Sequence, residues 1–320
     1  MSNEPVLDVR NIAKRFSGHV AVSDFSLAVP KGAIYGLLGP NGAGKTTSIR
    51  MIMNITIPDE GTVRLFGDDK GGRHHSARIG YLPEERGLYK KMKVRDMLIF
   101  LAETKGVARS RAATKADEWL ERLGLAEWRL RKVEELSKGM QQKVQFIGTM
   151  LHEPELLILD EPFSGLDPIN QQVLKDTIVQ LSRTGTTIIF STHQMEVAEK
   201  VCDHVCIIAK GRKVLDGLLN DVKATHGGTN VVVAFEDAKD GAAAMKAVSD
   251  LVAVADDSGV SAELTLRPGA DPQQVLERLM RQNIRLRRFE RVEPSLHRIF
   301  LDLAGPDALT PERRDEVNHA

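Results

Sequence analysis

The segment Gly39–Thr46 constrains the fold of this sequence more than any other segment. It reads Gly-Pro-Asn-Gly-Ala-Gly-Lys-Thr and fits the pattern G-x-x-x-x-G-K-[ST]. An apolar strand-like run, Ala33–Leu38, precedes it, and a helix-like stretch, Thr46–Met53, follows. A glycine-rich turn in this position lets backbone N–H groups surround phosphate oxygens at a helix N-terminus. The strand and helix on either side disfavour the alternative, a glycine turn with a chance lysine.

This loop predicts a binding site for a nucleoside triphosphate. We expect Lys45 to reach the β- and γ-phosphates and the Thr46 hydroxyl to ligate Mg²⁺. The residues predicted to bind the nucleotide lie in the loop and at the start of the helix: Gly39, Pro40, Asn41, Gly42, Ala43, Gly44, Lys45, Thr46 and Thr47.

Two further apolar strands end in polar residues. Leu156–Leu159 precedes Asp160 and Glu161, and Thr187–Phe190 is followed three residues later by His193. A strand, a helix and a strand at this distance form a parallel unit, so these residues share a sheet edge with the phosphate loop. We expect Asp160 to hold Mg²⁺ through water, Glu161 to orient or deprotonate the attacking water, and His193 to lie near the γ-phosphate. The alternative is a set of strand-end polar residues that face solvent.

Length and composition limit the remaining possibilities. A chain of 320 residues suggests about two domains. Lys plus Arg and Asp plus Glu are both 44, and this zero net charge argues against general nucleic-acid binding. No apolar run approaches the ~18 residues that span a bilayer, and the N-terminus lacks a signal-peptide pattern. The two cysteines, Cys202 and Cys206, are expected to be reduced.

The order of elements predicts an α/β core with additions. Short antiparallel strands are expected at the start, a helical insert follows at about 93–150, and a small α+β domain follows the core. The predicted domains are residues 1–215, residues 216–305 and a flexible tail, 306–320. The predicted short strands are Val6–Val9, Ala28–Val29 and Thr62–Phe66, and helices are expected at Gln141–Leu151, Ile169–Ser182 and Pro272–Arg281.

Three more motifs complete a recognisable pattern. Leu136–Gln142 reads Leu-Ser-Lys-Gly-Met-Gln-Gln, Ser164–Asp167 reads Ser-Gly-Leu-Asp, and His193 stands further on in the expected order. With the phosphate loop and the strand-end acids, they make residues 7–215 resemble the ATP-binding subunit of ABC transporters. The resemblance implies a P-loop NTPase core, and ATP and Mg²⁺ as cofactors.

The resemblance also implies a head-to-tail pair of cassettes, identical or closely related. Ser137 and Gly139, in the signature motif, would then cover the γ-phosphate held by the other chain, and Asp167 would couple the two sites. The implied catalytic residues are Lys45, Ser137, Gly139, Glu161 and His193. Phe16 matches the family's adenine-stacking aromatic residue, with a packed strand-end phenylalanine as the alternative.

The sequence departs from the family pattern near both motifs. Glu84 stands where the family has glutamine, and it remains able to ligate Mg²⁺ with Thr46 and Asp160, or points away in a structural role. In the signature, Lys138 replaces a glycine and Met140 replaces a glutamine. These changes affect the details of turnover and leave the class unchanged.

The segment Gly80–Lys90 and the C-terminal part resemble the sodium-efflux-type exporter ATPases. This resemblance implies a cytoplasmic subunit that powers export, of sodium or a drug-like solute, through a separate membrane-spanning permease at the inner face of the membrane. The helical insert from Lys93 to Gln141 and the segment around Glu84 are the expected docking surface. No nucleic-acid partner is expected. The alternatives are a soluble ABC ATPase acting on a ribosome or nucleic-acid complex, and a P-loop kinase, which the signature disfavours.

Other polar clusters favour structural roles. Cys202 to Cys206 straddles a helix end and a strand start, so its side chains need not converge on a metal. His74 and His75 lie in a Gly-Gly-Arg loop and are expected to be solvated. The basic stretch from Arg281 to Arg291 alternates with apolar residues and predicts a strand with one wet basic face, with a lipid or partner contact as the alternative.

Overall fold

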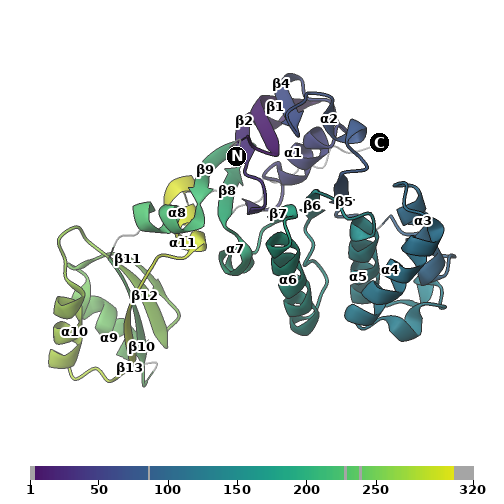
Figure 1. Cartoon of the computed structure of the whole chain (residues 1–320). Coiled ribbons are helices and arrows are strands. Elements are labelled where there is room, and N and C mark those ends of the chain that lie inside the picture. The colour runs from purple at the N-terminus through teal and green to yellow at the C-terminus, as the bar shows by residue number, and fades with distance from the viewer. Residues whose placement is uncertain (1–3, 86, 227–228, 238–239, 306–320) are drawn as a thin grey trace, which may run out of the picture. The chain divides into compact units, whose positions relative to one another are not determined.

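A computed structural model of the chain describes residues 4–85, 87–226, 229–237 and 240–305 (Figure 1). These residues form two compact units, one from residues 4–219 and 303–305 and the other from Asn220–Asp302. The expected boundary at 215/216 falls inside strand β9, a few residues before this division. The expected tail, 306–320, lies outside the described residues.

A six-stranded sheet forms the centre of the first unit. Its order is β5-β6-β7-β3-β8-β9, and all neighbours are parallel except β8 and β9. Every residue of β3 and β6 is buried, as their continuous apolar sequences predict. The strands are β3 (Ile34–Leu38), β5 (Ile79–Leu82), β6 (Leu156–Asp160), β7 (Thr187–Thr192), β8 (His204–Ala209) and β9 (Arg212–Leu218).

Helix α6 (Pro168–Arg183) connects β6 to β7, and these strands pair in parallel as predicted. The carboxyl ends of β3, β6 and β7 therefore lie at one edge of the sheet. Helix α7 (Met195–Val201) follows β7 and leads to β8. The phosphate loop, the acids Asp160 and Glu161, and His193 therefore all lie at the edge of the sheet where these strands end.

The first unit also contains a three-stranded antiparallel sheet in the order β2-β1-β4, and residues of both sheets share one hydrophobic cluster. Its strands are β1 (Leu7–Phe16), β2 (His19–Val29) and β4 (Glu60–Leu65). Strands β1 and β2 are longer than the short runs predicted. Register shifts between Val9 and Arg15 interrupt the period-two alternation, so the sequence pattern hides the length of the strand.

Helix α1 (Lys45–Ile52) packs between the two sheets. Its Ile49 and Ile52 belong to the same hydrophobic cluster as Ile12 of β1 and Ile158 of β6. Because α1 begins at the end of the phosphate loop, this cluster anchors the loop to both sheets.

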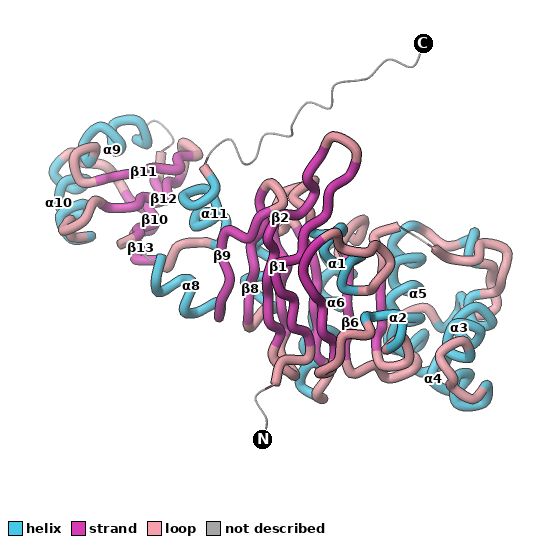
Figure 2. The backbone as a smooth tube through the Cα atoms, turned by 90° about the horizontal axis from the view of Figure 1, so that it is seen from above, coloured by secondary structure: helices cyan, strands magenta, loops and turns pink. Residues whose placement is uncertain are grey.

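The helical insert lies on one side of the first unit, beyond β6 in both views (Figures 1 and 2). It contains α3 (Val94–Glu103), α4 (Arg109–Arg122), two short 3₁₀ turns and α5 (Lys138–Met150). Helix α5 begins three residues earlier than predicted, because the Ser137 hydroxyl accepts the Met140 N–H at 3.3 Å and caps the helix.

The second unit has the order β10, α9, β11, β12, α10, β13, in an antiparallel sheet arranged β11-β12-β10-β13. This is the βαββαβ arrangement of ferredoxin-like folds, in which each helix crosses over one intervening strand. Residues of β10, β12, α9 and α10 form its hydrophobic core. The elements are β10 (Asn230–Phe235), α9 (Asp240–Val248), β11 (Val252–Asp257), β12 (Ser261–Leu266), α10 (Pro272–Arg281) and β13 (Leu286–Val292).

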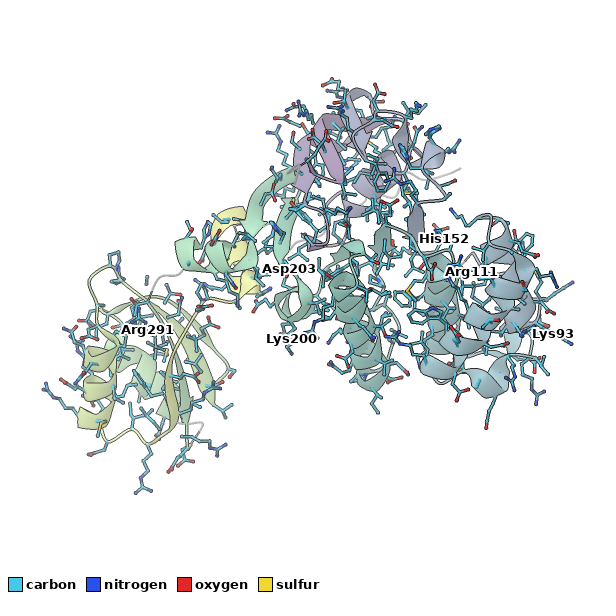
Figure 3. The ribbon with its side chains drawn as sticks, in the orientation of Figure 1. Lys93, Arg111, His152, Lys200, Asp203 and Arg291 are labelled. Atoms are coloured by element: carbon cyan, nitrogen blue, oxygen red, sulfur yellow. The ribbon has the colours of Figure 1, made fainter. Side chains whose placement is uncertain are left out.

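Two further helices, α8 (Leu219–His226) and α11 (Leu296–Ala304), precede and follow the βαββαβ segment in the sequence. Part of the basic stretch forms edge strand β13, on which Arg287, Arg288 and Arg291 are exposed; Arg291 is labelled in Figure 3. The predicted strand is present, but the prediction of one wet basic face was wrong. Arg288 pairs with Ala234 and Arg291 with Val231, so these two arginines point to opposite faces of the sheet.

The prediction for one histidine was wrong. His74 is exposed, but His75 is buried: its ring packs edge to face on Phe66, and its Nε2 lies 2.8 Å from an oxygen of Asp68. The predicted Gly-Gly-Arg loop is the short helix α2 (Gly71–His74). Cys202 and Cys206 are free and buried. The described residues contain no cluster of His, Cys, Asp and Glu suited to a metal ion, and no helix among them is long and apolar enough to cross a bilayer.

Candidate nucleotide site

The phosphate loop leaves β3 and enters α1 through backbone conformations that require glycine. Gly39 and Gly44 have φ of +152° and +104°. A Cβ on Gly39 would lie 2.1 Å from the Ile208 carbonyl oxygen, and one on Gly44 would lie 2.6 Å from the Ala21 carbonyl oxygen. The two glycines therefore let the loop pass close to neighbouring backbone, as the motif predicts.

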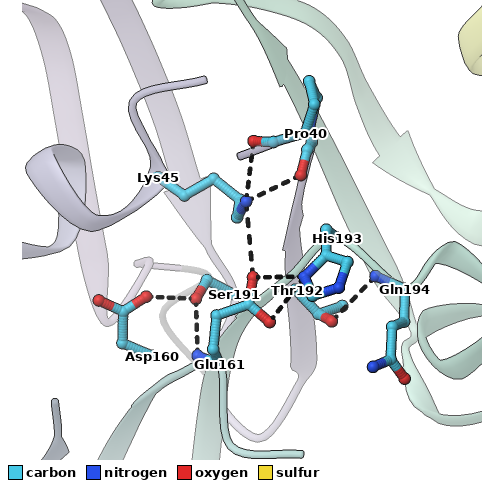
Figure 4. A network of polar contacts seen from close by, with 9 residues as sticks. Pro40, Lys45, Asp160, Glu161, Ser191, Thr192, His193 and Gln194 are labelled. Carbon is cyan, nitrogen blue, oxygen red and sulfur yellow. Dashed lines mark hydrogen bonds and ion pairs between the residues drawn. The ribbon is translucent and has the colours of Figure 1, made fainter. Parts of the chain in front are cut away.

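Lys45 projects from the first turn of α1 back over the loop. Its Nζ donates to the carbonyl oxygens of Gly39 at 2.8 Å and Pro40 at 3.0 Å, and lies 3.5 Å from Oε1 of Glu161 (Figure 4). Burial lowers the pKa of Lys45, whereas the nearby Glu161 raises it. The loop thus holds a buried cation above its own backbone, within reach of the strand-end acids.

Asp160, the last residue of β6, is fully buried. One carboxylate oxygen accepts a hydrogen bond from the Ser191 hydroxyl at 2.5 Å, and the other oxygen, Oδ2, is buried with no hydrogen-bond partner among the described residues. Burial raises the pKa of Asp160, and the hydrogen bond from Ser191 opposes this. An unpartnered buried carboxylate oxygen is the kind of group that a cation satisfies.

Glu161 follows the strand with a left-handed backbone, φ +48°. Its backbone N–H donates to the Ser191 hydroxyl at 3.0 Å, so Ser191 connects both acids to β7. Its side chain lies between Lys45 and His193, whose Nδ1 is 3.1 Å and 3.2 Å from the two carboxylate oxygens (Figure 4). The strained backbone turns the carboxylate towards the loop.

His193 is half-exposed, unlike the buried lysine and acids. Its neighbour Thr192 accepts the Gln194 N–H at 3.0 Å, which shapes the turn after β7. The structure therefore brings Lys45, Asp160, Glu161, Ser191 and His193 together as one group, called here the strand-end group.

A pocket of about 340 Å³ opens beside this group. Phe16 and Glu84 line it together with the phosphate loop. The lining residues are Phe16, His19, Ala21, Asn41, Gly42, Ala43, Gly44, Lys45, Thr46, Thr47, Glu84 and Glu161. Gly39 and Pro40 do not line this pocket and instead accept hydrogen bonds from Lys45.

Three contributors were missed from the sequence. His19 and Ala21 reach the pocket from β2, and no motif marks them. Ser191 precedes His193 by two residues, and its position at the end of a buried strand was the available signal. Only the register of β6 with β7, which pairs Asp160 with Ser191, shows what it contacts.

The signature residues do not line this pocket. Ser137 and Lys138 are exposed, and Gly139 is partly buried. A Cβ on Gly139 would meet the Leu166 side chain at 3.5 Å, so the signature lies beside the Ser164–Asp167 turn. Asp167 itself caps α6 by accepting the Asn170 N–H at 3.0 Å.

A glycine loop between β3 and α1, with its lysine and a strand-end acid pair, defines a P-loop nucleoside triphosphatase. Residues 22–164 match the ABC transporter family, and residues 217–304 match the family described as the ATP-binding protein DrrA1-3-like, C-terminal domain. The chain is 42% identical over 300 residues to the uncharacterized ABC transporter ATP-binding protein YhaQ of Bacillus subtilis, covering 94% of this chain and 99% of that protein.

Two other relatives have more specific names. The chain is 33% identical over 307 residues to the linearmycin resistance ATP-binding protein LnrL of Bacillus subtilis (94% of this chain, 98% of that protein). It is 33% identical over 301 residues to the Nod factor export ATP-binding protein I of Burkholderia lata (93% and 97%). A solved ATP-binding subunit of an ABC transporter superposes with a TM-score of 0.64 at 29% identity, covering 69% of this chain and 92% of that one.

The chain belongs to the ATP-binding proteins of ABC transporters, as its motifs predicted. It is an ATP-binding and ATP-hydrolysing transporter subunit, and the predicted α/β fold class is confirmed. The comparisons give no support to the alternative of a ribosome-acting ATPase.

Proposed function

We propose that this chain powers export through a separate membrane-spanning permease, by hydrolysing Mg²⁺-bound ATP between two cassettes. The observation that carries the catalytic part is the side chain of Glu161, held between the Lys45 ammonium and the His193 ring at the edge of the pocket. This arrangement suits a carboxylate that orients water at a γ-phosphate beside a lysine that binds the same phosphate.

Three oxygen ligands are available for the predicted magnesium ion. Oδ2 of Asp160 is buried and accepts no hydrogen bond from the part of the chain that the structure describes, and Thr46 and Glu84 line the neighbouring pocket. Hydroxyl and carboxylate oxygens are ligands that Mg²⁺ accepts, and the residues present therefore fit the ion. When bound, the ion would neutralise charge on the phosphate oxygens.

The chain's own residues then divide the work. Lys45 contributes positive charge to the β- and γ-phosphates, exchanging its contacts with the Gly39 and Pro40 carbonyls for phosphate oxygens. Glu161 orients the attacking water and accepts its proton, and His193 holds the carboxylate and contacts the γ-phosphate. Phe16, half-exposed at the pocket rim, stacks on adenine.

A second cassette, identical or related, supplies the signature residues, which do not line this chain's own pocket. Ser137 and Gly139 stand at the exposed N-terminus of α5, outside the chain's own pocket. A serine hydroxyl and a helix N-terminus favour a phosphate group, so we place them over the γ-phosphate of the partner cassette, with Asp167 between the two sites. The proposed assembly contains no nucleic acid.

The permease would dock on the helical insert and the segment around Glu84. Tyr89 and Phe100 are exposed large apolar side chains there, and their rings meet edge to face at 5.6 Å. Exposed aromatic pairs are common anchors of protein interfaces. Both residues follow Glu84 in the sequence, and Glu84 lines the nucleotide pocket, so the proposed docking surface and the pocket share this segment. Docking would hold the chain at the inner face of the membrane.

Export as the direction rests on the relatives named for Nod factor export and linearmycin resistance. Purification of the membrane partner with this chain, followed by ATP-driven transport in vesicles, tests it. Accumulation of a drug-like solute or of sodium on the side away from this chain supports export and selects between the two solutes. Movement only towards this chain's side contradicts it.

A further inference from the structure

Helix α5 carries a buried amide side chain to which the motifs assign no role. Gln145 is 7% exposed. Its Nε2 donates to the carbonyl oxygens of Pro83 at 3.4 Å and Glu85 at 3.2 Å. These two carbonyls flank Glu84, so one amide group holds the backbone on both sides of the predicted metal ligand.

The Glu84 loop, residues 83–85, has few other anchors. Among the described residues, its backbone makes no hydrogen bond to other backbone groups outside the helices and strands. The Glu85 carboxylate lies 3.8 Å from the Arg50 guanidinium, but the Glu85 side chain is 89% exposed, and such a pair contributes little. The amide of Gln145 is therefore the main polar contact that fixes the path of this loop.

The carbonyl oxygen of the Gln145 side chain indicates that this residue does more than stabilise the fold. Oε1 of Gln145 is buried with no hydrogen-bond partner among the described residues. A buried acceptor without a partner is unfavourable, and a methionine of similar shape would avoid it. What glutamine adds at this position is its pair of N–H donors, and both point to the Glu84 loop.

A second amide on α5 holds the other side of the site. Gln142 donates to the Pro162 carbonyl oxygen, directly after Glu161, at 3.2 Å. Residues three apart share one helix face, so Gln142 and Gln145 present neighbouring donors. Helix α5, whose first turn carries the signature, thereby contacts the backbone beside both Glu161 and Glu84.

We propose that Gln145 is a positioning residue that holds the Glu84 loop against the signature helix and so aims the Glu84 carboxylate into the nucleotide pocket. The part that concerns magnesium rests on the proposed role of Glu84 as a metal ligand. The part that concerns the loop rests on the two hydrogen bonds alone.

The first test is Gln145→Met in the full-length protein. Amide hydrogen exchange at Glu84 and Glu85 should rise about tenfold, because the loop loses its two side-chain donors. The Mg²⁺ concentration that gives half-maximal binding of a fluorescent ATP analogue should also rise about tenfold. Unchanged exchange in this loop would overturn the proposal. Gln145→Leu is measured in parallel, so that poor packing of one side chain does not decide the result.

The second test repeats Gln145→Met in a Glu84→Ala background. If Gln145 acts through Glu84, adding Gln145→Met to Glu84→Ala leaves the Mg²⁺ dependence of ATP-analogue binding unchanged. Amide hydrogen exchange in the Glu84 loop still rises. An equal shift in both backgrounds would show that Gln145 does not act through Glu84.

Gln141→Met is the matched control. Gln141 lies on the same helix and donates to the carbonyl oxygens of Leu136 at 3.0 Å and Val133 at 3.4 Å, away from Glu84. Its effects should add in full to those of Glu84→Ala and leave exchange in the Glu84 loop unchanged. If Glu84→Ala alone does not alter the Mg²⁺ dependence, the metal role of Glu84 is wrong, and the exchange measurement alone decides whether Gln145 holds the loop.

Discussion

The strand-end group and the signature segment, Leu136–Met140, differ in how many contacts their residues make within this chain. The strand-end group is joined by hydrogen bonds and ion pairs at the end of buried strands. In the signature segment, Ser137 and Lys138 are exposed, and the Ser137 hydroxyl accepts a hydrogen bond within its own helix cap. One region is organised within the chain, and the other is presented outward.

If hydrolysis takes place between two cassettes, as proposed, this difference would let one chain bind ATP by itself while turnover needs the signature of the partner. Burial and mutual contacts preorganise Lys45 and Glu161, so their contribution needs no second chain. Ser137 caps α5 by a hydrogen bond from the Met140 N–H, but it is outside the pocket lined by its own phosphate loop. The following substitutions test this division, from the largest expected effect to the smallest.

Glu161→Gln should lower turnover roughly a thousandfold while ATP still binds, because the amide keeps the shape of the carboxylate but cannot accept the proton. Steady-state hydrolysis and the size of the complex with ATP measure this, and a stable ATP-bound dimer is expected. Glu155→Gln is the control, because Glu155 directly precedes the first residue of β6 and so lies at the end of the strand opposite to Glu161. Near-normal hydrolysis would remove Glu161 from the mechanism.

Lys45→Ala should weaken ATP binding by about a hundredfold or more, since the buried ammonium is the main positive charge beside the loop. Equilibrium binding to the single chain measures it, with exposed Lys31→Ala as the control. Retention of tight binding would contradict the phosphate role of Lys45.

Ser137→Arg should leave ATP binding to the single chain within about twofold and lower cooperative hydrolysis about tenfold or more, because the large cation blocks the space for the partner's phosphate. Ser137→Thr keeps both the hydroxyl and the cap, and should stay near the original rate. A loss of binding to the single chain would break the division between the two regions.

Asp160→Asn should raise the midpoint of thermal unfolding near pH 7 by a few degrees. Burial raises the pKa of Asp160, so ionisation of this carboxyl costs stability at neutral pH. The cost is absent below the unfolded pKa and grows as the pH rises through the folded value, so the gain from asparagine should vanish near pH 3. A gain that is equal at both pH values would show that charge is not its cause.

The prediction from sequence succeeded where a chemical requirement is local. The glycines of the phosphate loop, the lysine after them and the two acids at the end of β6 follow from strand, turn and helix signals within a few residues. It did less well where the backbone departs from a regular period. Bulges in β1 interrupt the alternation of apolar and polar residues, so the predicted strand was too short. The contact between His75 and Asp68 follows no periodic sequence pattern.

By itself, the sequence determined the class of the protein and the positions of the phosphate loop and the strand-end acids, because these depend on short motifs in a fixed order. Only the tertiary structure showed that Ser191 joins the two acids, that His19 reaches the pocket and that Gln145 holds the backbone around Glu84. Such contacts join residues about 30 or 60 positions apart. Strand register and helix packing, which local periodicity does not encode, decide which of these residues meet.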